Sequence, residues 1–394
     1  MEAALAGITV IDFSRHLAGP FAAMTLGDLG ADVLKIEAPG RGDDTRGYLP
    51  FWNGVSCYYL SANRNKRSLT LNLQSTEGQA IARKLAAEAD ILIENFRPGT
   101  MERWGLGEAE LRGRNPRLIY CAISAVGSEG PDRDRAGVDL LMQAYAGLMS
   151  ITGYPEQPPV RVGTSAVDLT AGANAVQGIL AALYVRERTG RGQRVESSLL
   201  EGQVSWLTYH AVSYFGTGQV PGRLGSGHAS LAPYGAYPTS DGFLVLALAS
   251  DALWRRFCAA VGRPELAEDA RFARNEARMT NRPELEAEVG AILAERSAAE
   301  WGALFDAEGI PASTVNSLDT VLNLPQVLHR EMVVPLPRDD IPDLKLPGVA
   351  IKLSETPGTL RRPPPKLGEH SDDVLARLGY QPEEIARLHR EGVV

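Results

Sequence analysis

Gly-Ile-Thr-Val-Ile-Asp-Phe, residues 7–13, is a short apolar run that predicts a buried strand. A helical stretch follows Gly19-Pro20 and extends through Leu26, and Asp-Val-Leu-Lys-Ile-Glu at residues 32–37 predicts a second buried strand. Strand, helix and strand within about 30 residues form a βαβ unit, in which the strands are parallel and the crossover is right-handed.

The same alternation continues beyond this unit. Strand-like runs recur at residues 68–73, 90–96, 117–124 and 194–198, and helical patterns at 76–89, 138–148 and 169–185. Alternating strands and helices predict a doubly wound α/β fold, with a Rossmann-like parallel sheet and helices on both of its faces.

The sequence changes character after residue 200. Residues 213–242 are rich in glycine and proline and predict a linker or an ordered functional loop. Residues 243–249 predict a strand, and residues 251–309, rich in Ala, Glu and Arg, predict a small helical subdomain. Proline is dense again at 335–347 and 363–365, and residues 371–378 predict a short capped helix.

Length and composition bound the class of protein. A chain of 394 residues suggests two or three domains, or one large domain with an insertion. Hydrophobic residues make up 44% of the chain and charged residues 22%, which is typical of a globular protein and excludes a disordered or fibrous one. The net charge of −8 argues against nucleic acid as a partner, because non-specific binding needs a basic surface.

Signals for disulfides, metals and membranes are weak. Cys57, Cys121 and Cys258 do not have metal-ligand spacing, and an odd number argues against a disulfide framework. The histidines form no HExxH-type pattern, so we expect no metal. The N-terminus lacks a signal-peptide pattern, and the longest apolar stretch, residues 166–185, contains polar residues. We therefore expect a soluble cytoplasmic protein with no membrane partner.

Basic residues gather near the predicted turns between strands and helices, where doubly wound sheets bind their ligands. They are Arg41, Arg46, Arg64, Lys66, Arg67, Arg97 and Arg103. Arginine and lysine at such turns could hold phosphates. The other interpretation is a solvated face interspersed with Asp43, Asp44 and Glu102. The pattern alone leaves both open.

Asp168 follows an extended run and precedes a helix rich in Ala and Gly. One interpretation is an N-cap, which would stabilise the helix by about 1 kcal/mol. The other is a functional carboxylate, because backbone N–H groups and the positive end of the helix dipole could stabilise an oxyanion there. The small residues 171–173 would let a bulky ligand approach closely.

Several different short motifs are distributed along nearly the whole chain. They comprise Asp12-Phe13-Ser14 with Ala18-Gly19-Pro20, residues 30–37, Gly42-Asp43 with Arg46, residues 65–68, 94–99, 115–120, 167–172 and 189–193, and Gly368-Glu369-His370. In this order and spacing, the set resembles the family III CoA-transferases (the CaiB/BaiF family), which include formyl-CoA transferase and carnitine CoA-transferase. Each motif alone is weak, but the combination is specific.

The resemblance implies a particular domain organisation. A large Rossmann-like CoA-binding domain would comprise residues 1–200 and 330–394, and a smaller inserted α+β domain residues 225–325. Residues 201–224 and 326–335 would be linkers. Two chains would interlock as linked rings in a homodimer.

The resemblance also implies a reaction, in which the Asp168 carboxylate attacks the acyl-CoA donor. The enzyme would pass through a mixed anhydride and an aspartyl-CoA thioester before CoA reaches the acceptor acid. No histidine base would be needed, because a carboxylate is already ionised at pH 7. No cofactor would be tightly bound, since the CoA thioester is a substrate. The family suggests succinyl-CoA as donor and a small dicarboxylic or hydroxy acid as acceptor.

Further site residues follow from the resemblance. Its CoA contacts map to Arg103 at the phosphates, Arg41 near the ribose 3′-phosphate, Asn95 beside the pantetheine, and Leu71 or Asn72 at the adenine. The loop 222–228, with Gly225 and Gly227, matches a glycine-rich lid over the active site, although a plain interdomain linker is the other interpretation. Arg15, His16, Tyr145 and Tyr234 are candidates for the acyl pocket and could equally be structural.

Two rival functions remain. A 2-methylacyl-CoA racemase would have this fold and CoA site but uses a histidine in a Gly-His-Asp stretch as acid–base partner. The matching residues here are Gly137-Val138-Asp139, and valine cannot carry a proton. A non-catalytic CoA-binding protein would keep the basic contacts and lose Asp168. We therefore expect a transferase.

Overall fold

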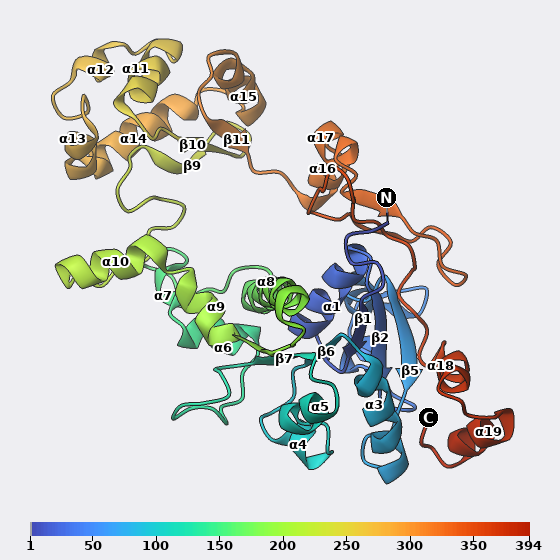
Figure 1. Cartoon of the computed structure of the whole chain (residues 1–394). Coiled ribbons are helices and arrows are strands. Elements are labelled where there is room, and N and C mark those ends of the chain that lie inside the picture. The colour runs from blue at the N-terminus through green and yellow to red at the C-terminus, as the bar shows by residue number, and fades with distance from the viewer. Residues whose placement is uncertain (1) are drawn as a thin grey trace. The chain divides into compact units, whose positions relative to one another are not determined.

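A six-stranded parallel sheet organises the first of the two units into which the chain divides (Figure 1). The structure is a computed structural model and describes residues 2–394. Unit 1 contains the chain up to Gly147, Val162–Ala211 and Leu324–Val394, and unit 2 contains Leu148–Arg161 and Val212–Asn323.

The sheet of unit 1 has the strand order β5-β2-β1-β6-β7-β8, with every neighbouring pair parallel. Its strands are β1 (Thr9–Asp12), β2 (Asp32–Glu37), β5 (Lys66–Thr70), β6 (Ile91–Glu94), β7 (Ile119–Ser124) and β8 (Arg194–Ser198). The chain moves outward from β1 to β5 and then returns to the other side of β1 for β6. The order therefore reverses between β1 and β6, which is the switch point of a doubly wound sheet.

Both faces of the sheet are covered, which explains why its strands are nearly continuous apolar runs. Val10 and Val33 face a core built with α1 and α8, whereas the next residues, Ile11 and Leu34, face a second core. Helices on the second face are α3, α5, α18 and α19 (Figure 1). The α/β class and the parallel sheet predicted from the sequence are confirmed.

The helices of unit 1 connect and cover these strands. They are α1 (Ala18–Asp28), η1 (Asp44–Gly47), α2 (Cys57–Ser61), α3 (Thr76–Glu88), α4 (Thr100–Arg103), α5 (Glu108–Arg114), α6 (Asp139–Tyr145), α8 (Ala166–Thr189), α9 (Leu199–Ser205), α17 (Pro325–His329), α18 (Ser371–Arg377) and α19 (Pro382–Arg390). Two short antiparallel pairs accompany them, β3 (Phe51–Trp52) with β4 (Val55–Ser56) and β12 (Val333–Pro335) with β13 (Lys345–Pro347).

The predicted strand at 68–73 lies two residues too late, because β5 begins at Lys66. The sequence pattern places the strand after the charged residues, since lysine rarely enters a buried strand unpaired. In the structure the Lys66 side chain is fully buried and paired with Asp12. A buried ion pair thus extends the strand into a charged stretch.

Helix α8 is 24 residues long and, by length and composition alone, apolar enough to span a membrane. Half of its most apolar window is buried inside the protein. Val176 and Ile179 pack in the core that α8 forms with α1 and the sheet. This burial is typical of a core helix.

Unit 2 has its own antiparallel sheet, with the order β11-β10-β9. The strands are β9 (Tyr234–Pro238), β10 (Phe243–Ala247) and β11 (Ala312–Thr314). The helices are α7 (Leu148–Ile151), α11 (Asp251–Ala260), α12 (Glu265–Glu268), α13 (Asn275–Thr280), α14 (Arg282–Leu293), α15 (Ala298–Ala307) and α16 (Leu318–Asn323). Their core contains Trp254, Phe257, Phe272, Trp301 and Phe305. The helical character predicted for residues 251–309 is confirmed.

Residues 213–242, predicted to be a linker or loop, contain more regular structure than expected. Helix α10 spans Thr208–Thr217, and β9 begins at Tyr234. The glycines do not break α10 because they lie at its end, where Gly218 has a φ of 69°. A left-handed residue directly after a helix is a common way to terminate it.

Gly172 gives a direct test of how α8 packs on α1. A Cβ atom at Gly172 would lie 2.5 Å from the carbonyl oxygen of Ala18 and 3.1 Å from Cδ1 of Phe21. Gly172→Ala should therefore lower the free energy of unfolding by about 1–3 kcal/mol, as overpacking does elsewhere. Urea denaturation measures this.

Gly113→Ala in α5 is the matched control, because no heavy atom lies within 4 Å of its Cβ position. Removing a helical glycine there should leave stability unchanged or raise it by up to about 1 kcal/mol. Equal effects of the two substitutions would contradict the close packing of α1 and α8.

Candidate active site

A cavity of about 610 Å³ opens in unit 1 beyond the carboxyl ends of β1, β6 and β7. This is the switch point of the sheet, where doubly wound folds bind their ligands. Side chains from several loops and from α8 line it. They include His16, Tyr48, Tyr58, Asn95, Phe96, Arg97, Ser124, Arg133, Arg135, Val138, Asp139, Ser165, Asp168 and Leu199.

Asn95 joins the loops that follow β1 and β6. Its Oδ1 accepts a hydrogen bond from the backbone N–H of Arg15 at 2.9 Å, and its Nδ2 donates to the Arg15 carbonyl at 2.8 Å. The side chain therefore bridges the switch point and fixes both walls of the cavity.

Two lysine–aspartate pairs lie buried beneath the loop after β1. Lys66 Nζ is 2.9 Å from Asp12 Oδ2, Lys35 Nζ is 2.9 Å from Asp43 Oδ2, and all four side chains are fully buried. Burial alone would raise the pKa of Asp12, but the Lys66 and Lys35 ammonium groups lower it overall. The pKa of Asp43 is likewise lowered, because Lys35 and hydrogen bonds from Thr45 outweigh its burial.

These pairs hold the loop after β1 in place. Lys35 donates to the Ser14 carbonyl at 2.8 Å, and Asp12 accepts the backbone N–H of Ser14 at 3.0 Å. Asp43 accepts the backbone N–H of His16 at 3.3 Å, and His16 has a φ of 64°. A left-handed backbone at a non-glycine residue is strained, so the buried charges stabilise a shape that the loop would not adopt alone.

A second group of buried polar residues extends this cluster. Arg46 donates to both Glu37 oxygens at 2.8 Å, and the Ser68 hydroxyl donates to Glu37 at 2.6 Å. The Ser68 hydroxyl also accepts the backbone N–H of Gly368 at 3.0 Å. Residues from several of the motifs quoted in the sequence analysis thus meet in one hydrogen-bond network. Their contacts here are with one another and hold the fold together.

Asp168 lies in the first turn of α8 and its carboxylate faces the cavity. Burial and the nearby Asp139 carboxylate raise the pKa of Asp168 to about 7. The expected ionisation of this carboxylate at pH 7 is therefore opposed by its surroundings. Burial and the neighbouring negative charge both favour the protonated form of Asp168 more than water does.

Asp139, rather than Asp168, caps the start of α8. Its Oδ1 accepts the backbone N–H of Val167 at 2.9 Å, and its Oδ2 accepts from Gln143 Nε2 at 2.6 Å. Gln143 Oε1 in turn accepts the backbone N–H of Val162 at 2.8 Å. The N-cap interpretation of Asp168 is wrong, because α8 begins at Ala166 and places Asp168 inside the helix.

Of the residues predicted from the sequence, Asp168, Asn95 and His16 line the cavity. The residues expected at the CoA phosphates and adenine, Arg41, Leu71, Asn72 and Arg103, do not line it. Leu71 is in the hydrophobic core, Asn72 accepts the backbone N–H of Gln74, and the exposed Arg103 donates to Thr100.

The remaining predicted residues lie elsewhere. The Arg15 guanidinium stands over the Phe96 ring, and Tyr145 donates to Asp132 outside this cavity. Gly225, Gly227 and Tyr234 belong to unit 2. There Gly225 donates to the Gly153 carbonyl at 2.8 Å, and the Tyr234 ring lies 5.2 Å from that of His228.

The sequence comparison with the racemase motif included Val138 and Asp139 but missed Arg133 and Arg135, in the loop between β7 and α6. Arg133, Arg135 and Asp139 come from this loop and the helix that it precedes. No local sequence pattern places the side chains of Arg133 and Arg135 at the cavity. Among residues 2–394, no group of three or more His, Cys, Asp or Glu side chains is arranged to hold a metal ion.

A doubly wound sheet with a carboxylate facing a cavity at its switch point is typical of α/β proteins that bind a ligand there. Comparison with known families makes this specific. The model of CoA-transferase family III matches residues 5–371. The chain belongs to this family and is a CoA-transferase, as its motifs predicted.

Individual relatives agree. The chain is 40% identical to the succinyl-CoA:glutarate CoA-transferase of Mus musculus, covering 99% of this chain and 90% of that one. It is 39% identical to the succinate–glutarate CoA-transferase of Agrobacterium fabrum, covering 95% of each. A solved CaiB/BaiF family protein from Brucella suis superposes with a TM-score of 0.87 at 35% identity, covering 96% of this chain and all of that one.

The raised pKa of Asp168 predicts a pH-dependent stability difference. The pKa is about 7 in the folded protein and about 4 for a free aspartate, so ionisation of Asp168 between these values destabilises the fold. Asp168→Asn removes this penalty. Its stability gain over the wild type should be small at pH 4 and grow as the pH rises to 8, as measured by urea denaturation.

Asp343→Asn is the control, because Asp343 is an exposed aspartate outside the cavity. The substitution serves to show how much of the effect of Asp168→Asn comes from the general loss of one negative charge. A constant difference for Asp168→Asn would show that the pKa of Asp168 is not raised.

Proposed function

We propose that this CoA-transferase moves CoA from succinyl-CoA to a small dicarboxylic or hydroxy acid, with Asp168 as the nucleophile. The observation that carries the proposal is the position of the Asp168 carboxylate, on the first turn of α8 and facing the cavity at the switch point. The names of the relatives support succinyl-CoA as donor.

In the proposed reaction, an oxygen of the ionised Asp168 carboxylate attacks the acyl carbon of succinyl-CoA. The carbon–sulfur bond breaks, giving CoA thiolate and a mixed anhydride between Asp168 and succinate. The thiolate then attacks the Asp168 carbonyl carbon, which releases succinate and leaves an aspartyl-CoA thioester. No ATP is consumed, because each step exchanges one activated acyl group for another.

The acceptor completes the cycle by the same chemistry. Its carboxylate attacks the aspartyl-CoA thioester, releasing thiolate and forming a second mixed anhydride. The thiolate attacks the acyl carbon of the acceptor, so that acceptor-CoA leaves and the Asp168 carboxylate returns. The positive end of the α8 dipole favours the negative charge that develops beside Asp168.

The charges around the cavity suit an anionic substrate. Arg97, Arg133 and Arg135 line it and could bind the CoA phosphates or the second carboxylate of the acyl group. Asn95 and His16 lie on the same walls. The proposed CoA contacts of Arg41, Leu71, Asn72 and Arg103, the acyl-pocket roles of Arg15, Tyr145 and Tyr234, and the lid containing Gly225 and Gly227 rest on the resemblance.

A racemase is the second candidate and receives less support. Racemisation needs a group that takes a proton from the carbon next to the thioester and another that returns it. Val138 stands on the cavity wall where that family has its histidine. The relatives are named as CoA-transferases.

We also propose an interlocked homodimer in which residues 225–325 belong to an inserted domain. Helix α10 supports the dimer, because none of its residues is buried. It leaves Phe215 79% and Val212 68% exposed. Large exposed apolar side chains on one helix are typical of an interaction surface, and a second copy of the chain is the proposed partner.

The covalent intermediate can be detected by intact-protein mass spectrometry. After brief incubation with succinyl-CoA, the wild type should gain the mass of CoA through Asp168, and Asp168→Ala should not. The variant should also lose transfer activity while retaining CoA binding. Asp343→Asn should form the adduct like the wild type.

Other outcomes separate the alternatives. Wild-type turnover by Asp168→Ala would overturn the mechanism. If neither protein forms an adduct, deuterium uptake into a 2-methylacyl-CoA would indicate a racemase. CoA binding without either reaction would indicate a non-catalytic protein.

The dimer is tested by light scattering coupled to gel filtration. The wild type should have the mass of two chains, and Val212→Glu/Phe215→Glu should reduce the dimeric fraction because it introduces charges into an apolar surface. The exposed residues of α17 supply a control, Leu328→Glu, which should leave the mass unchanged. A monomeric wild type would contradict the proposal.

A further inference from the structure

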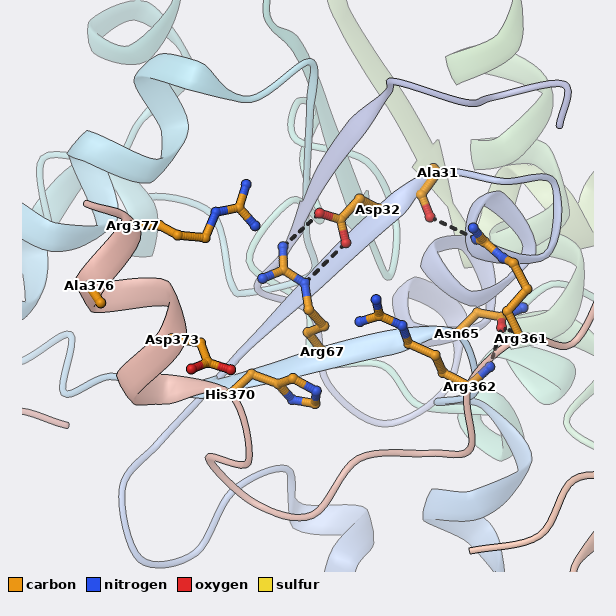
Figure 2. Close-up of a pocket in the computed structure, with 10 residues that line it drawn as sticks. All are labelled: Ala31, Asp32, Asn65, Arg67, Arg361, Arg362, His370, Asp373, Ala376 and Arg377. Atoms are coloured by element: carbon orange, nitrogen blue, oxygen red, sulfur yellow. Dashed lines mark hydrogen bonds and ion pairs between the residues drawn. The ribbon is translucent and has the colours of Figure 1, made fainter. Parts of the chain in front are cut away.

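A second cavity, of about 840 Å³, lies beside the amino ends of strands β2 and β5 of the same sheet (Figure 2). Asp32, at the start of β2, and Arg67, near the start of β5, form part of its wall. Arg361, Arg362 and Arg377 come from the C-terminal part of unit 1. Because the strands are parallel, this cavity is at their amino ends, whereas the Asp168 cavity lies beyond their carboxyl ends.

Positive charge exceeds negative charge in this wall. Four arginines and two aspartates, Asp32 and Asp373, line the cavity. Arg67 is neutralised by Asp32, to which it donates at 3.1 and 2.6 Å. Figure 2 shows the Arg67, Arg362 and Arg377 side chains projecting into the same space.

Three of the four guanidinium groups have no carboxylate partner. Arg361 donates to the carbonyl oxygens of Gly27 at 2.6 Å and Ala31 at 3.2 Å. The carboxylate that acts on its charge is Asp28, which is already paired with Arg64. Within residues 2–394, no carboxylate lies at ion-pair distance from Arg362 or Arg377. An anionic ligand would supply the missing charge.

The backbone that carries two of these arginines is held rigidly. Oδ1 of the buried Asn65 accepts the backbone N–H groups of Arg361 at 2.6 Å and Arg362 at 3.0 Å. Asn65 Nδ2 donates to Asp28 at 2.8 Å and to the Thr359 carbonyl at 2.8 Å. The consecutive arginines are therefore positioned before any ligand arrives, which lowers the entropy cost of binding.

The lining also limits the kind of anion. His370 carries the one aromatic ring among the residues that line the cavity, and its Nδ1 accepts the backbone N–H of Ser68 at 3.3 Å. Ala31 and Ala376 are the apolar residues. Such a wall offers little surface for stacking a nucleobase, whereas guanidinium groups match phosphate and carboxylate oxygens in pairs.

We propose that this cavity is a binding site for a small polyanion with two or more phosphate or carboxylate groups. Arg362 and Arg377 bind it directly, and Arg361 adds to the positive field. The site is separate from the Asp168 cavity, and the proposal does not depend on the proposed catalytic role of Asp168.

Isothermal titration calorimetry on the full-length protein tests this. Inorganic pyrophosphate or citrate is titrated into the protein at constant ionic strength and without CoA, because CoA itself carries phosphate groups that this cavity would bind. We expect saturable binding of at least one probe and at least tenfold weaker binding by Arg362→Ala/Arg377→Ala. Arg330→Ala/Arg390→Ala, which removes the same charge from exposed positions outside the cavity, should bind like the wild type.

Each outcome has a defined meaning. Tighter binding of pyrophosphate indicates a phosphate ligand, and tighter binding of citrate indicates a polycarboxylate. Absence of saturable binding for both probes, or unchanged affinity in the double variant, overturns the site. Arg377→Gln, which changes one exposed side chain at the end of α18, should weaken binding several-fold with an unchanged circular dichroism spectrum. Transfer activity of these variants should equal that of the wild type, which separates this proposal from the catalytic one.

Discussion

Two buried lysine–aspartate pairs are the constraint on which the candidate active site depends. Asp12 with Lys66 and Lys35 with Asp43 tie β1, β2 and β5 to the loop that forms one wall of the cavity. Removing one member of such a pair typically costs about 3–5 kcal/mol, because an unpaired charge is left buried. The pairs therefore add little net stability but strongly favour one arrangement of the strands and the strained loop at His16.

The same low-dielectric surroundings act differently on Asp168, which has a like charge beside it instead of a lysine. Asp139 caps the start of α8 and at the same time disfavours ionisation of Asp168. Asp139 thus stabilises helix α8 but disfavours the ionised form of Asp168, which lies on the same helix. Such opposition between folding and reactivity is common where a buried group does chemistry.

The sequence predicted the sheet well, because strands covered on both faces are apolar runs that need no tertiary information. It failed where distant residues decide the outcome. Lys66 enters β5 only because Asp12 is there to pair with it, and Asp168 is not an N-cap because Asp139 takes that role. Arg133 and Arg135 reach the cavity through the path of a loop, which no local pattern predicts. The cavity lined by four arginines was not predicted for the same reason, since Arg67 and Arg377 are far apart in sequence.

The helices α18 and α19 cover the second face of the sheet, with Leu375 and Leu388 packed in the same core as Ile11 and Leu34. The backbone N–H of Asn72, directly after β5, donates to the carbonyl of Val393 at 2.8 Å. The strands of this sheet are synthesised early, but two of the helices that bury them are synthesised last. Until those helices emerge, the part of this sheet face that α3 and α5 leave uncovered is open to water and to other nascent chains. Unit 1 therefore completes its core only after unit 2 has been synthesised.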